Sequence, residues 1–275
     1  MKRLLEWFCC PGKLISGVMR RFRLGSTPLR VRYDGFAWPH YAYGVFQAAI
    51  LAKSLNVPRI SVAEFGVAGG RGLIALENAS IAIERWSGVK IDVWGFDSGC
   101  GMPAPVDIRD HMYNWKSGML VMNKSKLEGY LTRAKLVLGK IFETSTQFLQ
   151  RTDFGPLGFV SVDVDYYSST MDVFRIFEGT HATRLPRVYI YMDEVSIPDQ
   201  EELHYHAFTE FLGERLAIRD FNAAHQAKKI SKLHGLANQR PIRSMWSDRI
   251  YVLHDFEHPQ YNTFITPAQF TELPI

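Results

Sequence analysis

Short apolar runs alternate with segments of helical periodicity along most of the chain. The apolar runs are rich in β-branched and aromatic residues, as expected for buried strands. They lie at residues 60–65, 89–96, 135–139, 159–164, 187–192 and 249–254. Between them, apolar residues recur three or four positions apart, as in amphipathic helices, at residues 41–55, 73–86, 143–149, 171–178 and 202–221. This alternation predicts an α/β fold.

A glycine-rich turn joins the first predicted strand to the helix that follows it. Gly66, Gly69 and Gly70 lie in this turn, as expected where backbone approaches a ligand closely. Their spacing does not match the G-x-G-x-x-G pattern of dinucleotide-binding turns. Glu64 stands two positions before the first glycine, and its carboxylate would repel a pyrophosphate. The turn therefore favours S-adenosylmethionine, which has an amino group and a sulfonium, over NAD; a turn without any ligand is the alternative.

The second predicted strand ends in an acidic residue, Asp97. An acid in this position accepts hydrogen bonds from vicinal ribose hydroxyls, which NAD and S-adenosylmethionine both have. The alternative is a structural role, because an Asp before Ser98 and a glycine is typical of a turn.

Four carboxylates follow two of the later predicted strands. Asp163 and Asp165 stand at the end of the fourth strand, where alternation places them on the same side. Asp193 and Glu194 follow the fifth strand. Parallel strands end at one edge of a sheet, so these acids can converge there. Their repulsion favours a divalent cation such as Mg²⁺ or a base with raised pKa, and the alternative is a set of caps and solvated strand ends.

Several stretches resemble the motifs of class I S-adenosylmethionine-dependent methyltransferases, in particular the macrocin O-methyltransferase (TylF-like) family. They are Glu64-Phe65-Gly66-Val67-Ala68-Gly69-Gly70, Gly95-Phe96-Asp97-Ser98, Asp163-Val164-Asp165-Tyr166 and Asp193-Glu194. The resemblance implies a Rossmann-like class I methyltransferase fold with a mostly parallel seven-stranded sheet and helices on both faces. It also implies an O-methyltransferase activity.

The resemblance further implies roles for individual residues. The residues expected to bind the cofactor are Glu64, Gly66, Gly69, Gly70, Asp97 and Ser98. Those expected to bind Mg²⁺ are Asp165, Asp193 and Glu194, with Asp165 also the catalytic base. The family usually has two aspartates where this chain has Asp193-Glu194, so the third ligand is longer by one methylene.

The connection at residues 100–130 is long for a compact domain and is predicted to contact the substrate. His111 and Tyr113 supply polar and aromatic groups there, and Tyr166, next to the candidate base, is a third substrate candidate. A single histidine is more often a surface or packing residue than a base, and that interpretation of His111 stays open.

Charge divides the chain into two parts. Residues 1–32 carry eight Lys or Arg against one Glu, a net charge of +7, which leaves −3 for the rest of a chain with a total of +4. Residues 1–25 interleave apolar residues with these cations, which predicts an amphipathic helix interrupted at Pro11-Gly12. This arm either packs on the protein or binds an anionic membrane or a partner. Residues 33–275 form the predicted methyltransferase domain.

Other features limit the classes of protein to consider. No apolar run reaches the roughly 20 residues that span a bilayer. Three cysteines are an odd and sparse set, which indicates neither a disulfide framework nor a zinc site. We therefore expect a cytoplasmic protein without a nucleic-acid partner, and the sequence does not decide between a monomer and a homo-oligomer.

Together these features predict an S-adenosylmethionine-dependent O-methyltransferase, assisted by Mg²⁺, that acts on a hydroxyl of a sugar-containing or other small-molecule acceptor. Two other functions stay open. Val162-Asp163-Val164-Asp165 also resembles the Asp-x-Asp metal motif of glycosyltransferases. A non-catalytic methyltransferase-like protein could instead use its basic arm to bind a membrane or a partner.

Overall fold

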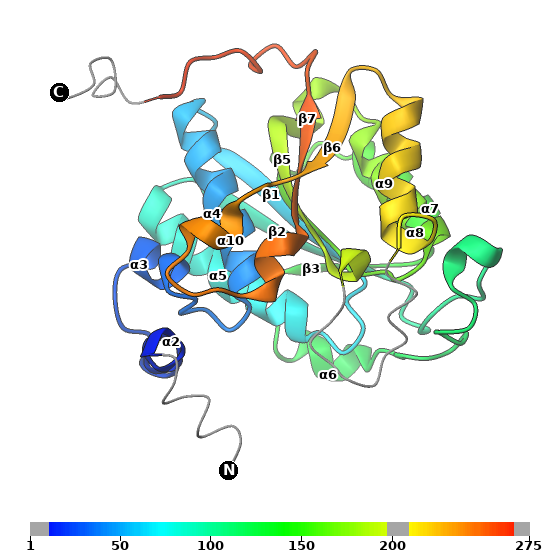
Figure 1. Ribbon diagram of the computed structural model, residues 1–275, viewed down its shortest axis with the longest axis horizontal. Helices are drawn as coiled ribbons and strands as arrows, with labels where there is room; N and C mark the ends of the chain where they lie inside the picture. The colour runs from blue at the N-terminus through cyan, green and yellow to red at the C-terminus, as the bar shows by residue number, and fades with distance from the viewer. Residues whose placement is uncertain (1–10, 197–208, 267–275) are drawn as a thin grey trace.

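A seven-stranded sheet forms the centre of the protein (Figure 1). The computed structural model describes residues 11–196 and 209–266. The strands lie in the order β3-β2-β1-β4-β5-β7-β6. They are β1 (Arg59–Phe65), β2 (Lys90–Asp97), β3 (Lys135–Leu138), β4 (Leu157–Val162), β5 (Arg184–Met192), β6 (Lys228–Lys232) and β7 (Ile250–Asp255). The pairs from β3 to β5 are parallel and β7 is antiparallel to β5 and β6, which confirms the predicted mostly parallel α/β sheet.

Helices cover both faces of this sheet (Figure 1). On one face lie α3 (Thr27–Arg32), α4 (Pro39–Ser54) and α5 (Arg71–Ser87). On the other lie α7 (Ile141–Leu149), α8 (Tyr167–Phe174) and α9 (Gly213–Ala224). The remaining α-helices of the described residues are α2 (Pro11–Phe22), α6 (Lys124–Glu128) and α10 (Leu236–Gln239).

Alternate residues of the central strands supply two separate cores. Ile60 and Val62 of β1 pack with α4 and α5, whereas Ala63 and Phe65 pack with α7, α8 and α9. Strand side chains alternate between faces, so a strand covered on both sides needs an almost continuous apolar sequence. Glu64 interrupts that sequence at the carboxyl end of β1, where it is nevertheless buried.

The fourth strand ends earlier than the sequence predicts. β4 ends at Val162, so the alternation expected for residues 159–164 does not position Asp163 and Asp165. The chain leaves the sheet at this point, and Asp165 has a left-handed backbone with φ of 62°. That conformation is uncommon outside glycine. The prediction of a shared strand face is wrong, because a turn, not the strand, positions these carboxylates.

The helix after these acids also begins differently. The sequence predicts Ser168, Ser169 and Thr170 as caps of a helix over residues 171–178, but α8 begins at Tyr167 and no cap side chain bonds to its end. The Ser168 amide donates instead to Asp110 Oδ1 at 2.8 Å. An acid from the long connection therefore satisfies this helix N-terminus.

The described part of the basic arm packs on the protein. Within the described residues α2 begins at Pro11, and proline suits a helix start because its missing amide needs no partner there. Ser16 Oγ donates to the Asp34 carbonyl at 2.8 Å, and Met19 is buried. Residues 1–10 and the first part of the helix predicted at 202–221 lie outside the described residues. No helix within 11–196 and 209–266 is long and apolar enough to cross a membrane.

Candidate functional site

The glycine turn after β1 is shaped by close backbone contacts. A Cβ on Gly66, which has φ of 88°, would lie 1.7 Å from the Asp163 carbonyl oxygen, so only glycine fits there. Gly70, with φ of 82°, stands at the N-cap of α5. A Cβ on Gly69 would meet no atom within 4 Å. The turn therefore joins β1 tightly to the end of β4 and leaves open space at Gly69.

Glu64 lies beneath this turn in a hydrogen-bonded chain. The Tyr41 hydroxyl donates to Glu64 Oε1 at 2.7 Å, and Ser161 Oγ donates to the Tyr41 hydroxyl at 2.8 Å. A Cβ on Gly72 would lie 1.8 Å from the same oxygen, so that glycine makes room for the carboxylate. Burial raises the pKa of Glu64 to about 8, with a smaller contribution from the charge of Asp97. Glu64 Oε2 is buried and has no hydrogen-bond partner, which leaves an acceptor for a donor ligand.

Asp97 organises the same turn from the end of β2. Its Oδ2 accepts a hydrogen bond from the Ala68 amide at 2.8 Å, and its Oδ1 accepts one from the Gly99 amide at 2.6 Å. The Ser98 hydroxyl donates to the Gly101 carbonyl at 2.9 Å. Asp97 and Ser98 thus form hydrogen bonds within the turn, as the alternative of a structural role expects. Their contact with a cofactor stays a prediction.

Four buried or half-buried carboxylates gather where β4 and β5 end. Burial raises the pKa of Asp165 to about 7, and the charge of Asp193 adds to this effect. Burial likewise raises the pKa of Glu194 to about 8, with the charges of Asp165 and Asp193 next. The pKa of Asp163 is raised by burial and then by Asp193. The charge of each acid thus affects the pKa of its neighbours, as expected if the four predicted acids lie close together.

Two residues that the sequence analysis did not identify complete this cluster. Glu214, in the first turn of α9, is buried and accepts a hydrogen bond from the Glu194 amide at 2.9 Å. Arg249, just before β7, donates to Asp193 Oδ1 at 2.8 Å and to Ser196 Oγ at 3.0 Å. A lone arginine beside a strand and an acid at a helix start carry no motif, so only the fold could reveal their roles.

The predicted metal ligands do not form a metal site as they are arranged. Within residues 11–196 and 209–266, no group of three or more His, Cys, Asp or Glu side chains could hold a metal ion. Asp193 Oδ1 accepts hydrogen bonds from Arg249 and from the Tyr191 hydroxyl at 2.5 Å. The Arg249 guanidinium therefore supplies positive charge where the sequence predicts a metal cation. In this arrangement Asp165, Asp193 and Glu194 do not fit Mg²⁺.

His40 links the carboxylates to the glycine turn. Its ring stacks on Tyr191 with centroids 4.2 Å apart and meets the Tyr41 ring edge at 4.8 Å. Burial, together with the charge of Arg249, lowers the pKa of His40 to about 3. The imidazole is therefore neutral at physiological pH, and its packing positions the two tyrosines.

The long connection at residues 100–130 is attached to the site by one acid. Asp110 Oδ2 accepts hydrogen bonds from Ser168 Oγ at 2.8 Å and from the Val106 amide at 2.7 Å. Asp110 is fully buried. Its other oxygen, Oδ1, accepts a hydrogen bond from the Ser168 amide. Asp110 therefore connects the loop to the first turn of α8, the helix that begins shortly after Asp165.

The three predicted substrate residues lie in different surroundings. His111 is buried with φ of 42°, and neither ring nitrogen has a hydrogen-bond partner. Its ring lies against Gly213, where a Cβ would be 2.2 Å from Nε2. Tyr166 is buried and its hydroxyl is unpartnered, whereas Tyr113 is exposed. Contact with a substrate stays a prediction for all three, and the packing interpretation of His111 agrees with its burial.

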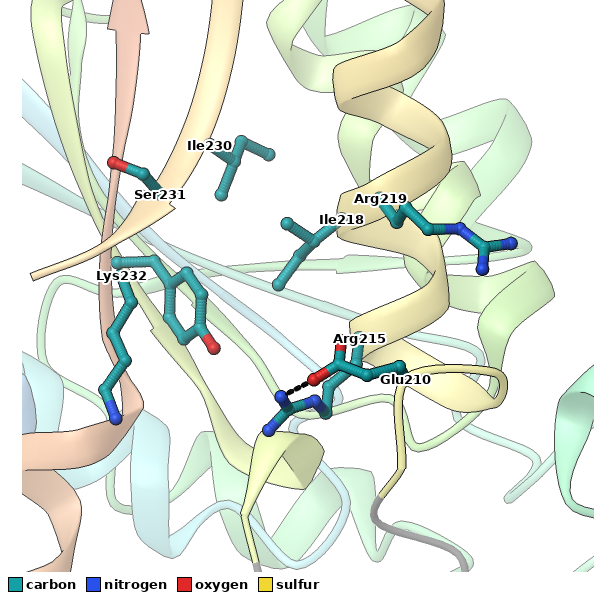
Figure 2. Close-up of a pocket in the computed structure, with 8 residues that line it drawn as sticks. Glu210, Arg215, Ile218, Arg219, Ile230, Ser231 and Lys232 are labelled. Atoms are coloured by element: carbon teal, nitrogen blue, oxygen red, sulfur yellow. Dashed lines mark ion pairs between the residues drawn. The ribbon is translucent and has the colours of Figure 1, made fainter.

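Figure 2 shows side chains that line a cavity between α9 and the strands β6 and β7. The volume of this cavity is about 210 Å³. Its charged side chains form ion pairs, namely Glu210–Arg215, Arg219–Asp220 and Lys232–Asp248. Each charge there already has a partner, so the cavity is not the candidate site.

Comparison with known proteins agrees with this architecture. No family model and no curated protein matches the chain. Among solved structures, the calicheamicin methyltransferase CalS11 is 21% identical with a TM-score of 0.51, over 76% of this chain and 77% of that one. The fold is that of a methyltransferase. An apo structure of CalS11, described as a TDP-rhamnose 3'-O-methyltransferase, is 21% identical over 76% and 78% of the two chains with a TM-score of 0.41. An O-methyltransferase from Bacillus cereus in complex with SAH is 13% identical over the same shares, with a TM-score of 0.36. These similarities concern the fold, and membership of the TylF-like family stays a prediction.

Proposed function

We propose that the protein is an S-adenosylmethionine-dependent O-methyltransferase that acts on a hydroxyl of a sugar-containing or other small-molecule acceptor. The observation that carries the proposal is the position of Asp165. Its buried carboxylate stands on a left-handed turn at the same sheet edge as the open glycine turn. In a methyltransferase fold this arrangement places a candidate base beside a candidate cofactor site.

The residues have separate roles in this proposal. S-adenosylmethionine, when bound, supplies an electrophilic methyl group. The open space at Gly69 accommodates the cofactor, Glu64 Oε2 accepts a hydrogen bond from its amino group, and Asp97 accepts hydrogen bonds from its ribose. Asp165 takes the proton from the acceptor hydroxyl. With S-adenosylmethionine bound, its methyl group would pass to the acceptor oxygen, and the sulfur would keep the electron pair of the broken carbon–sulfur bond.

A metal has no step in this mechanism. The sequence predicts Mg²⁺ at Asp165, Asp193 and Glu194, but Arg249 already bonds to Asp193 Oδ1 at 2.8 Å. An ion there would have to displace the guanidinium or use the other oxygen. We therefore propose that Arg249 balances these carboxylates during the reaction. Turnover that is lost with a chelator and restored by Mg²⁺ would contradict this part of the proposal and support the metal-assisted alternative.

The decisive experiment is calorimetric titration of the full chain with S-adenosylhomocysteine. The test variant is Gly69→Leu, because a Cβ at Gly69 would meet no described atom within 4 Å and the leucine would extend into the proposed cofactor space. We expect binding by the wild type and a loss of affinity of at least about tenfold in the variant, equivalent to about 1.4 kcal/mol. The thermal midpoint should stay within a few degrees.

Gly129→Leu is the matched control. Gly129 has φ of −66°, and a Cβ there would make only ordinary contacts at 3.4 Å, outside the glycine turn. This variant should bind S-adenosylhomocysteine like the wild type. Absence of binding by the wild-type chain would overturn the proposed function, and binding of a nucleotide sugar in its place would favour the glycosyltransferase alternative.

A further inference from the structure

A second, larger cavity has a lining that includes none of the clustered carboxylates. It has a volume of about 510 Å³ and lies among α2, the segment at residues 33–38 and the outer face of α5. Figure 1 shows α2 and α3 beside α5 on this side of the sheet. The volume falls within the range of about 300–1,000 Å³ typical of small-molecule sites.

Five arginines line this cavity, and none of its lining residues within the described part of the chain is acidic. They are Arg20, Arg23, Arg30, Arg71 and Arg85. Within residues 11–196 and 209–266, none of the five forms an ion pair, whereas the buried or half-buried Arg184, Arg240 and Arg249 each pair with an aspartate. Like charges gathered at one surface repel one another unless an anion balances them. These five arginines therefore face one cavity without a counter-ion among the described residues.

One of these arginines is held in a fixed orientation. The Arg30 guanidinium stacks over the Phe36 ring at 4.0 Å and donates to the Gly35 carbonyl at 3.2 Å. Its Nε is buried and has no hydrogen-bond partner. Burial lowers the pKa of Arg30, and the charge of Arg23 lowers it further. A bound anion would relieve both the repulsion and the unpartnered donor.

We propose that this cavity binds a phosphate-bearing ligand, with a phosphoryl or diphosphoryl group on the arginines and an apolar or aromatic part on Phe36 and Trp38. Guanidinium groups present paired donors that match phosphate oxygens, which makes arginine clusters well suited to this anion. The half-buried aromatic and aliphatic part of the lining, Trp38 with Ile74 and Ile81, supplies the contact for the rest of the ligand. Binding at this site does not depend on methyl transfer.

The cavity is adjacent to the proposed cofactor turn. The Trp38 ring meets the Tyr41 ring at 5.1 Å, and the Tyr41 hydroxyl donates to Glu64. Arg71 is the first residue of α5, directly after Gly70. A ligand anchored here by its phosphate lies one side-chain layer from the residues proposed to hold the cofactor.

Two sources can supply such a phosphate, and α2 offers a way to separate them. This helix exposes Leu14, Ile15, Val18 and Phe22 to solvent beside the cavity. A lipid-borne phosphate would bring a membrane into contact with these side chains, because basic amphipathic helices bind anionic bilayers. A soluble nucleoside diphosphate would not use them.

The test measures binding of sodium pyrophosphate and uridine diphosphate by calorimetry, and of vesicles of phosphatidylcholine with phosphatidic acid by co-sedimentation. The test variant is Arg71→Gln with Arg85→Gln, since both side chains are exposed and make no hydrogen bond or ion pair within the described residues. We expect it to weaken binding of at least one probe about tenfold or more, since charge-assisted hydrogen bonds to phosphate are lost. Higher ionic strength should weaken the wild-type interaction as well.

Lys90→Gln with Lys126→Gln is the control, because it removes the same charge from exposed positions outside the cavity. It should change the affinity for each probe by no more than about twofold. A tenfold loss would correspond to about 1.4 kcal/mol. If Phe22→Ser also weakens vesicle binding but leaves pyrophosphate binding unchanged, the result supports the proposed site and indicates a lipid-borne phosphate. If the soluble probes bind and Phe22→Ser does not change their affinity, the result supports the proposed site and indicates a soluble phosphate ligand. No binding of any probe, or equal losses in the control, would overturn the proposal.

Discussion

Asp165 stands in a backbone conformation that few non-glycine residues adopt, with φ of 62°. Such strain costs about 1–3 kcal/mol and persists only where the surroundings impose it. Here the chain must turn between the end of β4 and the start of α8, and Asp110 fixes the first turn of that helix. The turn holds a buried carboxylate in place, which suits a group that must accept a proton in a defined position.

Replacement of this carboxylate tests its role directly. Asp165→Asn keeps the shape of the side chain, and Asn tolerates the left-handed backbone. We expect kcat to fall about 100-fold or more, because general-base catalysis contributes about 10²–10⁴-fold. S-adenosylhomocysteine affinity, measured by calorimetry, should stay within about twofold, since a tenfold change would need about 1.4 kcal/mol of binding energy.

Asp153→Asn is a suitable control, because Asp153 lies on the surface in ion pairs with Arg151 and Lys135. It should leave turnover near the wild-type value. If Asp165→Asn retains turnover while binding cofactor, Asp165 is not the base.

At the scale of elements, one acid connects a long loop to the helix that follows the candidate base. Asp110 accepts three hydrogen bonds, two from Ser168 and one from the Val106 amide. The sequence predicts a substrate loop at residues 100–130 but gives no sign of this attachment, because the two partners are 58 positions apart. Local pattern assigns the cap to the serines of α8, whereas the fold brings a stronger acceptor to the same amide.

Removal of this acid should release the loop. Asp110→Ala removes a buried acceptor and leaves the donors of Ser168 and Val106 without this partner, and we expect a loss of stability of about 1–3 kcal/mol. Hydrogen exchange should become faster at residues 104–120 and in the first turn of α8. Glu257→Ala, which removes an exposed carboxyl group outside the loop, is the control and should leave exchange unchanged both at residues 104–120 and in α8. Unchanged exchange in α8 after Asp110→Ala would show that this contact does not hold the loop.

At the scale of the whole molecule, the free energy of unfolding should depend on pH through the buried acids. Burial raises the pKa of Glu64 to about 8, whereas an unfolded glutamate titrates near 4.3. Between these values the folded state binds a proton that the unfolded state does not. Stability from this group is therefore fully present below about pH 4.3 and is lost as pH rises toward 8.

Urea unfolding between pH 5 and pH 8 measures this effect. Glu64→Gln should make the dependence of unfolding free energy on pH shallower, by up to about 1.4 kcal/mol per pH unit. Glu257→Gln, which alters an exposed carboxyl group, should leave the slope as in the wild type. A slope that Glu64→Gln does not change would show that Glu64 is ionised in the folded protein.

The sequence by itself predicted six of the seven strands of the sheet, the glycine turn and four of the acids in the carboxylate cluster, but it did not predict β6. These features depend on local composition: apolar runs predict buried strands, and glycines mark the turn where Gly66 meets the Asp163 carbonyl. Bounds agree within a few residues for β2, β3, β5 and β7 and for α4 and α5.

Only the tertiary structure decided which groups meet at the site. Arg249 reaches Asp193 because β7 inserts beside β5, and Glu214 reaches Glu194 because α9 packs over the strand ends. Three arginines of the larger cavity, Arg20, Arg23 and Arg30, belong to the basic arm that the sequence marks, but only the fold brings Arg71 and Arg85 of α5 beside them. The physical reason is that burial and charge balance depend on neighbours in space. Asp193, which the sequence predicts as a metal ligand, therefore pairs with Arg249 in the structure.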